Sequence, residues 1–225
     1  MNIKSLDTIN KSFAEFSQTT LNKRATSNYL LSHLKSYEKD YKRAGALELF
    51  LKQVYQLADN CFKKGLNDFA GMMYSSMIKN EAIPDNIREI IINRAIEVTR
   101  AQKDPIHELA RVVDLKHLYL RNPETTAKKK LKNNIAEETL LKKIINNFDD
   151  STDNFKTVKK NSNQLDLYRF RLALVEVDIA KATIRTEKKS ALKKLVHAKK
   201  IFNELGKTTE AKFAQQLINQ IDYRY

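Results

Sequence analysis

The histidines are the residues whose positions come nearest to a metal or acid–base site. The chain has four of them: His33, His107, His117 and His197. Only His107 and His117 lie close enough in sequence to share a site, with Asp114 between them. On a helix Asp114 and His107 share a face, but His117 points about 80° away from His107. No second Glu-x-x-His motif of the di-iron type occurs, so we interpret these side chains as structural.

Other residue types that carry chemistry are equally scattered. The single cysteine, Cys61, lies in an apolar periodic segment and is predicted to be a small core residue. The acid pairs Glu137-Glu138 and Asp149-Asp150 diverge by about 100° on a helix, so we interpret them as surface residues. Neither G-x-G-x-x-G nor G-x-x-x-x-G-K-[ST] occurs. The sequence therefore predicts no enzyme, no metal site and no cofactor.

Basic residues are the most suggestive feature. The formal net charge is +14, and the residues after position 120 contribute 23 basic and 13 acidic groups of the total. A C-terminal half with this excess of basic residues attracts polyanions, acidic protein surfaces or anionic lipid at low salt. A composition rich in Lys, Asn and Ile also arises from AT-rich coding bias without any selection for binding. Both interpretations stay open.

In one predicted helix, over 190–205, most of the basic residues lie on the same side. Its apolar residues take one side, and a positive stripe follows another side at three- and four-residue spacing: Lys189, Lys193, His197 and Lys200. Phosphate backbones bind such a stripe through counterion release. No arginine or aromatic residue is interleaved with these lysines, so neither base contacts nor base stacking is indicated. A solvated face is the alternative.

The elements that must position these residues are helices. Only 4 Gly and 3 Pro occur, and 42% of the residues are hydrophobic. Periodic apolar spacing predicts about nine helices, the clearest over 47–62 and 67–81 with Gly65 at the turn between them. Less certain helices are Ile3 to Phe16 and Ser27 to Arg43. We therefore predict an all-α protein.

Three further helix starts are indicated by capping residues. Asn86 with Glu89 resembles a capping box, and Asp104-Pro105 is an N-cap followed by proline at the first helical position. Asn122-Pro123-Glu124 repeats that opening for a helix lasting to about Phe148. The later helices are predicted over 165–184, 190–205 and 208–221.

Residues Val54 to Ala82 resemble a tetratricopeptide repeat. The matching positions are a large–small pair, the turn glycine, a small residue and an aromatic residue: Leu57-Ala58, Gly65, Ala70 and Tyr74. The repeat proline falls two residues late, at Pro84. A weaker match over 175–206 has small-large-small spacing at Ala191, Leu195 and Ala198.

This resemblance implies a solenoid of stacked antiparallel helix pairs, because each pair must cover its apolar face with another pair. The intervening helices depart from the family's period of about 34 residues, so other helical hairpin arrays and a non-repetitive bundle remain alternatives. The predicted organisation is N-terminal helices over 1–45, a helical-repeat core over 46–148, a linker or exposed loop over 149–163, and a basic helical hairpin with a terminal helix over 164–225.

The resemblance also implies a function. Proteins of this type mostly act as scaffolds or adaptors that hold a partner protein or peptide in a concave groove. Groove residues are then expected from the first helix of each pair: Gln53, Gln56, Asp59, Asn60, Lys63, Arg88, Asn93 and Arg100. The alternative is a basic helical protein that binds nucleic acid through its C-terminal half. Oligomeric state stays open.

The segment from Met1 to Thr20 contains no continuous apolar stretch of the kind that a secretory signal needs. No window approaches the roughly 18 apolar residues of a membrane span. We therefore expect a cytoplasmic protein.

Overall fold

The chain forms α-helices throughout the residues that the structure, a computed structural model, describes. These are residues 23–149 and 155–222, and they contain nine helices and no strand. The prediction of an all-α fold is confirmed over these ranges. The helix expected from Ile3 to Phe16 lies outside them. Within the described helices, none is long and apolar enough to cross a membrane.

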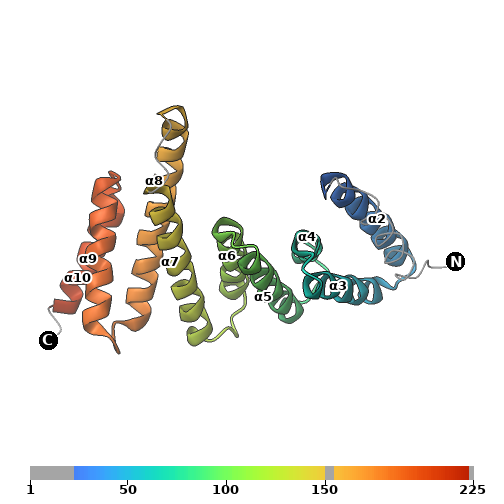
Figure 1. The fold of residues 1–225 in the computed structure, drawn as a ribbon. Coiled ribbons are helices and arrows are strands. Elements are labelled where there is room, and N and C mark those ends of the chain that lie inside the picture. The colour runs from blue at the N-terminus through green and yellow to red at the C-terminus, as the bar shows by residue number, and fades with distance from the viewer. Residues whose placement is uncertain (1–22, 150–154, 223–225) are drawn as a thin grey trace. The chain divides into compact units, whose positions relative to one another are not determined.

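The helices belong to two compact units that divide between Lys103 and Asp104. This division falls inside the range 46–148 that the sequence analysis groups as one core. Unit 1 contains α2 (Lys23–Arg43), α3 (Leu47–Lys63), α4 (Asn67–Ile78) and α5 (Asp85–Ala101). In this unit α3 packs on α4 and α4 packs on α5, with α2 against α3 (Figure 1).

Unit 1 is held by the apolar stripe that the sequence predicts. Phe50, Val54, Leu57, Ala58 and Cys61 of α3 are all buried. They face the buried side chains of α4, which are Phe69, Ala70, Met73, Tyr74, Met77 and Ile78. Ala58 and Ala70 are 0% exposed, and small residues on two packed helices let the helices approach closely.

Gly65 ends α3 in the way that its position predicts. Its φ is +74°, in the left-handed region that glycine adopts at little cost. The turn then closes through Gly65 N to Phe62 O (2.9 Å) and Leu66 N to Cys61 O (2.8 Å), which satisfies carbonyl groups at the helix end. Gly206, with φ of +67°, ends a later helix likewise.

The capping box predicted at Asn86 is wrong. Helix α5 begins at Asp85 with Pro84 as its N-cap and without a side-chain cap. The reason is that the carbonyl oxygen of Pro84 already accepts the first helical bond, from Arg88 N at 2.9 Å. Asn86 therefore lies inside the first turn and not at the N-cap position, so its side chain does not cap the helix.

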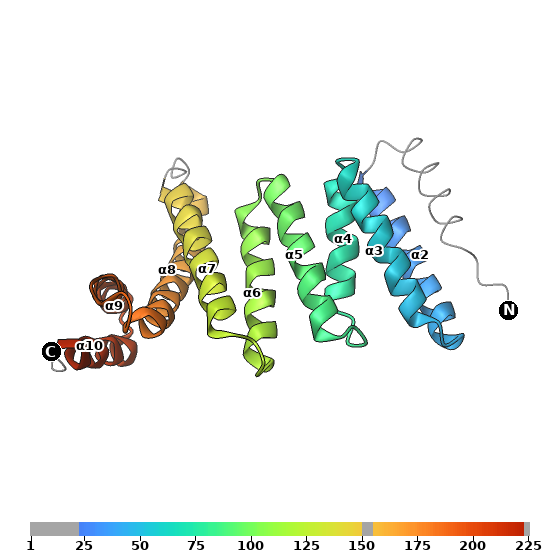
Figure 2. The same ribbon diagram turned by 90° about the horizontal axis from the view of Figure 1, so that it is seen from below.

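Unit 2 contains α6 (Pro105–Arg121), α7 (Ala127–Asp149), α8 (Phe155–Thr183), α9 (Lys188–Glu204) and α10 (Thr208–Asp222). Each helix packs on the next one along the chain (Figure 2). Because most of the connections are short, consecutive helices run antiparallel. The start of α7, the end of α8 and the start of α9 therefore lie at the same end of this unit.

The first helix of unit 2 begins as predicted, and the second does not. The Asp104 carboxylate caps α6 by accepting bonds from Ile106 N (3.1 Å) and His107 N (3.0 Å). Asn122 instead closes a turn, accepting from Glu124 N at 2.9 Å. Helix α7 starts only at Ala127, where Thr126 Oγ1 accepts from Lys129 N at 3.3 Å. The same short-range bond that caps a helix also forms such turns, so the motif at Asn122 was ambiguous.

The segment 149–163, expected as a linker or exposed loop, is helical at each of its described residues, 149 and 155–163. Helix α8 begins at Phe155, well before the predicted start at residue 165. Helix growth adds one hydrogen bond per residue once a nucleus exists, and the buried second half of α8 supplies that nucleus. The polar N-terminal part of α8 can therefore be helical without an apolar stripe of its own.

Candidate functional site

The groove residues predicted on α3 mostly serve contacts within unit 1. Gln53 accepts a hydrogen bond from the Tyr41 hydroxyl group at 3.1 Å, which joins α3 to α2. Asp59 pairs with Lys63 (2.7 Å) and with Arg94 of α5 (3.2 Å). Gln56 and Asn60 are exposed.

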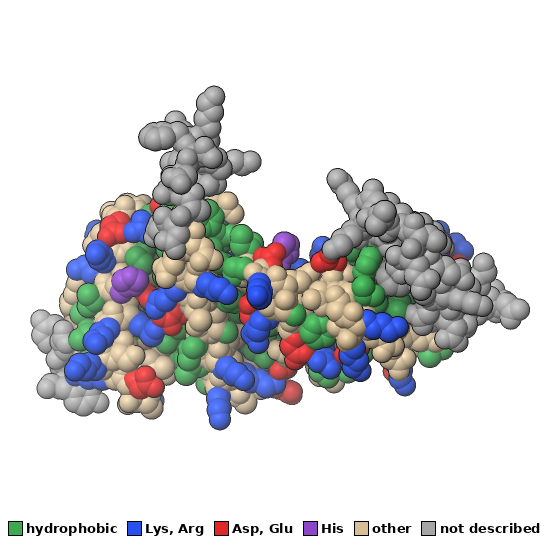
Figure 3. Space-filling model, viewed as in Figure 1, with side chains coloured by type: hydrophobic (Ala, Val, Ile, Leu, Met, Phe, Trp, Pro, Cys, Tyr) green, Lys and Arg blue, Asp and Glu red, His purple; other side chains and the backbone are tan. Residues whose placement is uncertain are grey.

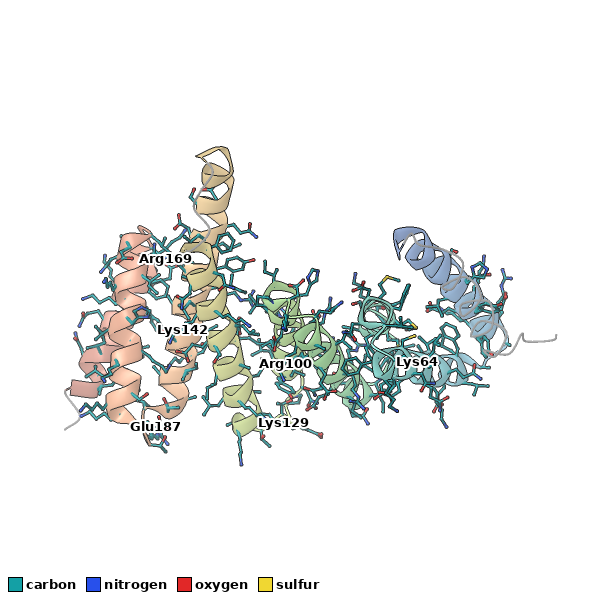
Figure 4. All side chains as sticks on the ribbon, in the orientation of Figure 1. Lys64, Arg100, Lys129, Lys142, Arg169 and Glu187 are labelled. Atoms are coloured by element: carbon teal, nitrogen blue, oxygen red, sulfur yellow. The ribbon has the colours of Figure 1, made fainter. Side chains whose placement is uncertain are left out.

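The residues predicted on α5 divide in the same way. Arg88 donates to the carbonyl oxygens of Asn80 (2.9 Å) and Ile83 (2.8 Å), so its guanidinium group holds the connection between α4 and α5. Asn93 donates to Glu89 O of its own helix at 2.9 Å. Arg100 is exposed at the end of α5 (Figure 4). Five of the eight expected side chains are exposed, namely Gln56, Asn60, Lys63, Asn93 and Arg100, and the other three are partly buried.

A partly exposed polar cluster that joins α3 to α5 was not predicted from the sequence. Arg94 of α5 contacts Asp59 and also Glu97, at 2.5 Å. Beneath them Tyr74 is 0% exposed, and its hydroxyl group has no hydrogen-bond partner among the described residues. Burial and the nearby Asp59 carboxylate raise the pKa of Tyr74 well above its ordinary value. Tyr74 therefore stays a neutral phenol.

The residues whose types could support catalysis lie apart. His107 is 2.6 Å from Asp104, the helix cap, while Asp114 pairs with Arg111 at 2.7 Å. Cys61 is buried, and that burial raises the pKa of its thiol to about 11. No group of three or more His, Cys, Asp or Glu side chains within the described ranges is arranged to hold a metal ion.

The predicted positive stripe on α9 is interrupted. Lys189 and Lys193 line a shallow open pocket of about 540 Å³ at the turn before α9. Lys200 is exposed and lies 3.9 Å from Glu204. His197, the fourth member, instead directs Nδ1 to Glu176 of α8 at 2.7 Å. Of the four residues in the predicted stripe, only Lys189 and Lys193 therefore line the same pocket.

The Glu137-Glu138 pair, predicted to be on the surface, is buried. Glu137 is 0% exposed and Glu138 is 6% exposed, and Glu176 of α8 is 2% exposed. The prediction is wrong because basic side chains from neighbouring helices cover these carboxylates. Among the described residues, five basic side chains surround the carboxylates of Glu137, Glu138 and Glu176. They are Lys116, Lys142, Arg171, Lys194 and His197.

Glu138 and Glu176 form one part of this network, between α7, α8 and α9. Lys142 lies 2.6 Å from Glu138 and 3.5 Å from Glu176 (Figure 4), and Lys194 of α9 lies 2.5 Å from Glu138. Burial opposes ionisation of Glu138, but the hydrogen bonds from Lys142 and Lys194 outweigh it and lower the pKa of the carboxyl group. The network therefore holds charged groups in place between three helices.

Glu137 forms the other part, between α6, α7 and α8. Its Oε1 accepts from Arg171 Nε at 2.6 Å, and its Oε2 lies 3.2 Å from Lys116 Nζ. Lys116 also lies 3.3 Å from Asp178 of α8. Oε2 of Glu137 has no hydrogen-bond partner among the described residues. The ammonium group of Lys116 is thus fixed between two carboxylates.

Lys116 also lines a pocket of about 350 Å³, here called the lysine pocket. Its walls come from the second half of α6, the start of α7 and the end of α8: Lys116, Tyr119, Leu120, Lys130, Asn133, Asn134, Asp178, Lys181 and Ala182. In the described part of the chain, no ion pair involves Lys130 or Lys181; Lys181 Nζ lies 5.8 Å from the ring centre of Phe213. The lining therefore includes two lysines without an ion pair among the described residues, beside Lys116, whose ammonium group is fixed.

The surface of unit 2 carries many basic side chains. Figure 3 shows Lys and Arg side chains over the part of the surface that α7, α8 and α9 form in this view, with Asp and Glu side chains among them. The two labelled residues Lys129 and Glu187 lie at the same end of these helices (Figure 4). This arrangement suits an anionic group with apolar neighbours, since Tyr119 and Leu120 line the same pocket.

Comparisons of the chain with protein-family models, with curated proteins and with solved structures find no match. The likeness of residues 54–84 and 175–206 to tetratricopeptide repeats therefore stays a prediction from the sequence.

Proposed function

We propose that this protein is a non-enzymatic scaffold of stacked helix pairs, similar to tetratricopeptide repeats, that binds an acidic segment of a partner protein in the lysine pocket. The observation that carries the proposal is the meeting of Lys116, Lys130 and Lys181, from three different helices, in one pocket. Opposite charge across an interface raises the association rate and selects the partner. A net charge of +14 acts in the same direction over a longer range.

The pocket supports this function better than the residues first expected on α3 and α5. Three of those eight side chains are held by contacts within unit 1, since Gln53 bonds to Tyr41, Asp59 to Arg94, and Arg88 to backbone carbonyl groups. Lys130 and Lys181 instead have no anionic partner in the described part of the chain. The binding of an anion there removes no existing ion pair from these two lysines.

The absence of catalysis is part of the proposal. Acid–base catalysis needs a group whose protonation can change near neutral pH and which reaches a substrate. The buried carboxylates Glu137 and Glu138 are instead covered by basic side chains. An arrangement of this kind joins helices and fixes side chains in position.

A fluorescein-labelled octaglutamate peptide tests the proposal. Fluorescence anisotropy at about 150 mM salt should show binding that the double variant Lys130→Glu/Lys181→Glu weakens at least about tenfold. The matched control is Lys52→Glu/Lys79→Glu, which changes the net charge equally at exposed lysines of unit 1. Equal weakening by both variants would show a long-range charge effect and refute a specific pocket.

Nucleic-acid binding is a second candidate, favoured by the open pocket at the start of α9. Lys188, Lys189 and Lys193 lie together there, at the same end of unit 2 as the basic start of α7. Retention on heparin or DNA at physiological salt, lost in the triple variant Lys189→Glu/Lys193→Glu/Lys200→Glu, would support this candidate. Retention that is unchanged in that variant would refute it.

A further inference from the structure

The charge of the lysine pocket indicates which anionic group it takes. The residues that line it include three lysines, Lys116, Lys130 and Lys181, and one acidic residue, Asp178, so the formal charge of the lining is +2. Glu137 lies behind Lys116, but Arg171 pairs with it at 2.6 Å and compensates its charge. A ligand that neutralises the pocket therefore carries two negative charges on one compact group.

Geometry restricts the ligand further. Lys116 is held in place by Glu137 at 3.2 Å and by Asp178 at 3.3 Å, so one cation is preorganised at the wall between α6 and α8. Asn133 donates Nδ2 to Val112 O of α6 at 3.1 Å, which orients its amide group, and Asn134 lies beside it in the lining. Several donors around a compact space suit an oxyanion that accepts hydrogen bonds on several oxygens.

We propose that the lysine pocket recognises a phosphorylated side chain, of the phosphoserine type, in the acidic segment of the partner protein. The inference rests on the proposed function and adds the identity of the bound group. A phosphate monoester carries a charge of about −1.5 to −2 at pH 7 and has three acceptor oxygens, whereas a carboxylate carries one charge and two oxygens. The phosphate thus matches the +2 lining and the carboxylate leaves half of that charge uncompensated.

Two short peptides that differ in one side chain test this inference. The probes are acetyl-Gly-phosphoserine-Gly-amide and acetyl-Gly-Glu-Gly-amide, titrated into the full-length ¹⁵N-labelled protein. We expect the phosphopeptide to shift the side-chain amide signals of Asn133 and Asn134 and to bind at least about tenfold more tightly than the glutamate peptide. The variant Lys130→Gln/Lys181→Gln should lose this difference, and the control Lys52→Gln/Lys79→Gln should keep it.

A second measurement follows the ligand itself. Binding in a pocket lined by three lysines favours the dianion, so the second pKa of the phosphate, about 6 when free, should fall in the ³¹P spectrum when wild-type protein is added. The same addition of the Lys130→Gln/Lys181→Gln variant should leave it near the free value. An unchanged pKa with wild-type protein would overturn the inference.

The outcomes separate this inference from the function on which it rests. Equal binding of the two peptides, with octaglutamate binding still dependent on Lys130 and Lys181, overturns phosphate recognition and leaves the acidic-segment scaffold standing. Failure of octaglutamate and of both peptides to depend on these lysines overturns both. A phosphopeptide that binds both lysine double variants as tightly as it binds the wild type also overturns the inference.

Discussion

Nδ1 of His197 lies 2.7 Å from Oε2 of Glu176, a carboxylate that is only 2% exposed in the second half of α8. The contact joins α9 to α8, and Lys142 reaches the other oxygen of Glu176 from α7 at 3.5 Å. A buried carboxylate is costly to leave without partners. His197 therefore stabilises the interior of unit 2 rather than belonging only to a solvent-facing stripe.

The first prediction concerns this pair. We expect His197→Ala to lower the free energy of unfolding by about 2 kcal/mol, because the variant removes a hydrogen bond to a charged and buried group. The double variant His197→Ala/Glu176→Gln should be more stable than the sum of the single effects implies, since the glutamine carries no charge to compensate. Urea denaturation of the four proteins measures the coupling, and strictly additive values would refute it.

The second prediction concerns pH. Lys142 and Lys194 lower the pKa of Glu138 from its ordinary value of 4.5, so this carboxylate stabilises the fold at pH values above about 4.5. That stabilisation is lost as the pH falls through the lowered pKa of the folded state. The stability difference between wild type and Glu138→Gln should be constant from neutral pH down to about 4.5 and shrink below it. The exposed Glu124→Gln variant is the control and should show no such trend.

The third prediction compares two glycines near the same turn. Gly65 has φ of +74°, and an alanine there strains the backbone although no atom would clash, so Gly65→Ala should cost about 1 kcal/mol. Gly71 lies inside α4, and an added Cβ would meet Val98 Cγ1 at an ordinary 3.6 Å. Gly71→Ala should therefore stabilise by about 0.5–1 kcal/mol. Thermal unfolding measures both, and equal signs would contradict the argument.

Much of the fold follows from local physics and could be predicted. The apolar spacing of Phe50, Val54 and Leu57 requires a buried helix face, and Gly65 requires a left-handed turn. The capping carboxylate of Asp104 likewise acts on amides only two and three residues away. Prediction from local sequence was wrong where the same motif can form either a helix cap or a turn. Asn122 is such a case, because it closes a turn instead of starting a helix.

The candidate site could not be predicted because its partners are distant in sequence. Arg171 lies 34 residues from Glu137, and Lys194 lies 56 residues from Glu138. One signal was present: Glu137 shares its helix face with Leu141, in the way that an apolar core residue would. The lysine pocket carried no comparable signal, because Lys130 and Lys181 belong to different helices and have no periodic relation.

The last prediction concerns the hydroxyl group of Tyr74. It is fully buried between α3 and α5 without a hydrogen-bond partner among the described residues, and the ring of Tyr55 packs 5.8 Å from its own ring. A buried polar group without a partner costs about 1–3 kcal/mol, so its removal by Tyr74→Phe should leave stability unchanged or raise it by about 1 kcal/mol. Tyr41→Phe is the control, because its hydroxyl donates to Gln53 at 3.1 Å and its loss should destabilise. Urea denaturation compares the two variants. A destabilised Tyr74→Phe protein would show that the hydroxyl is bonded in solution, with a buried water molecule beside Asp59 as the natural partner.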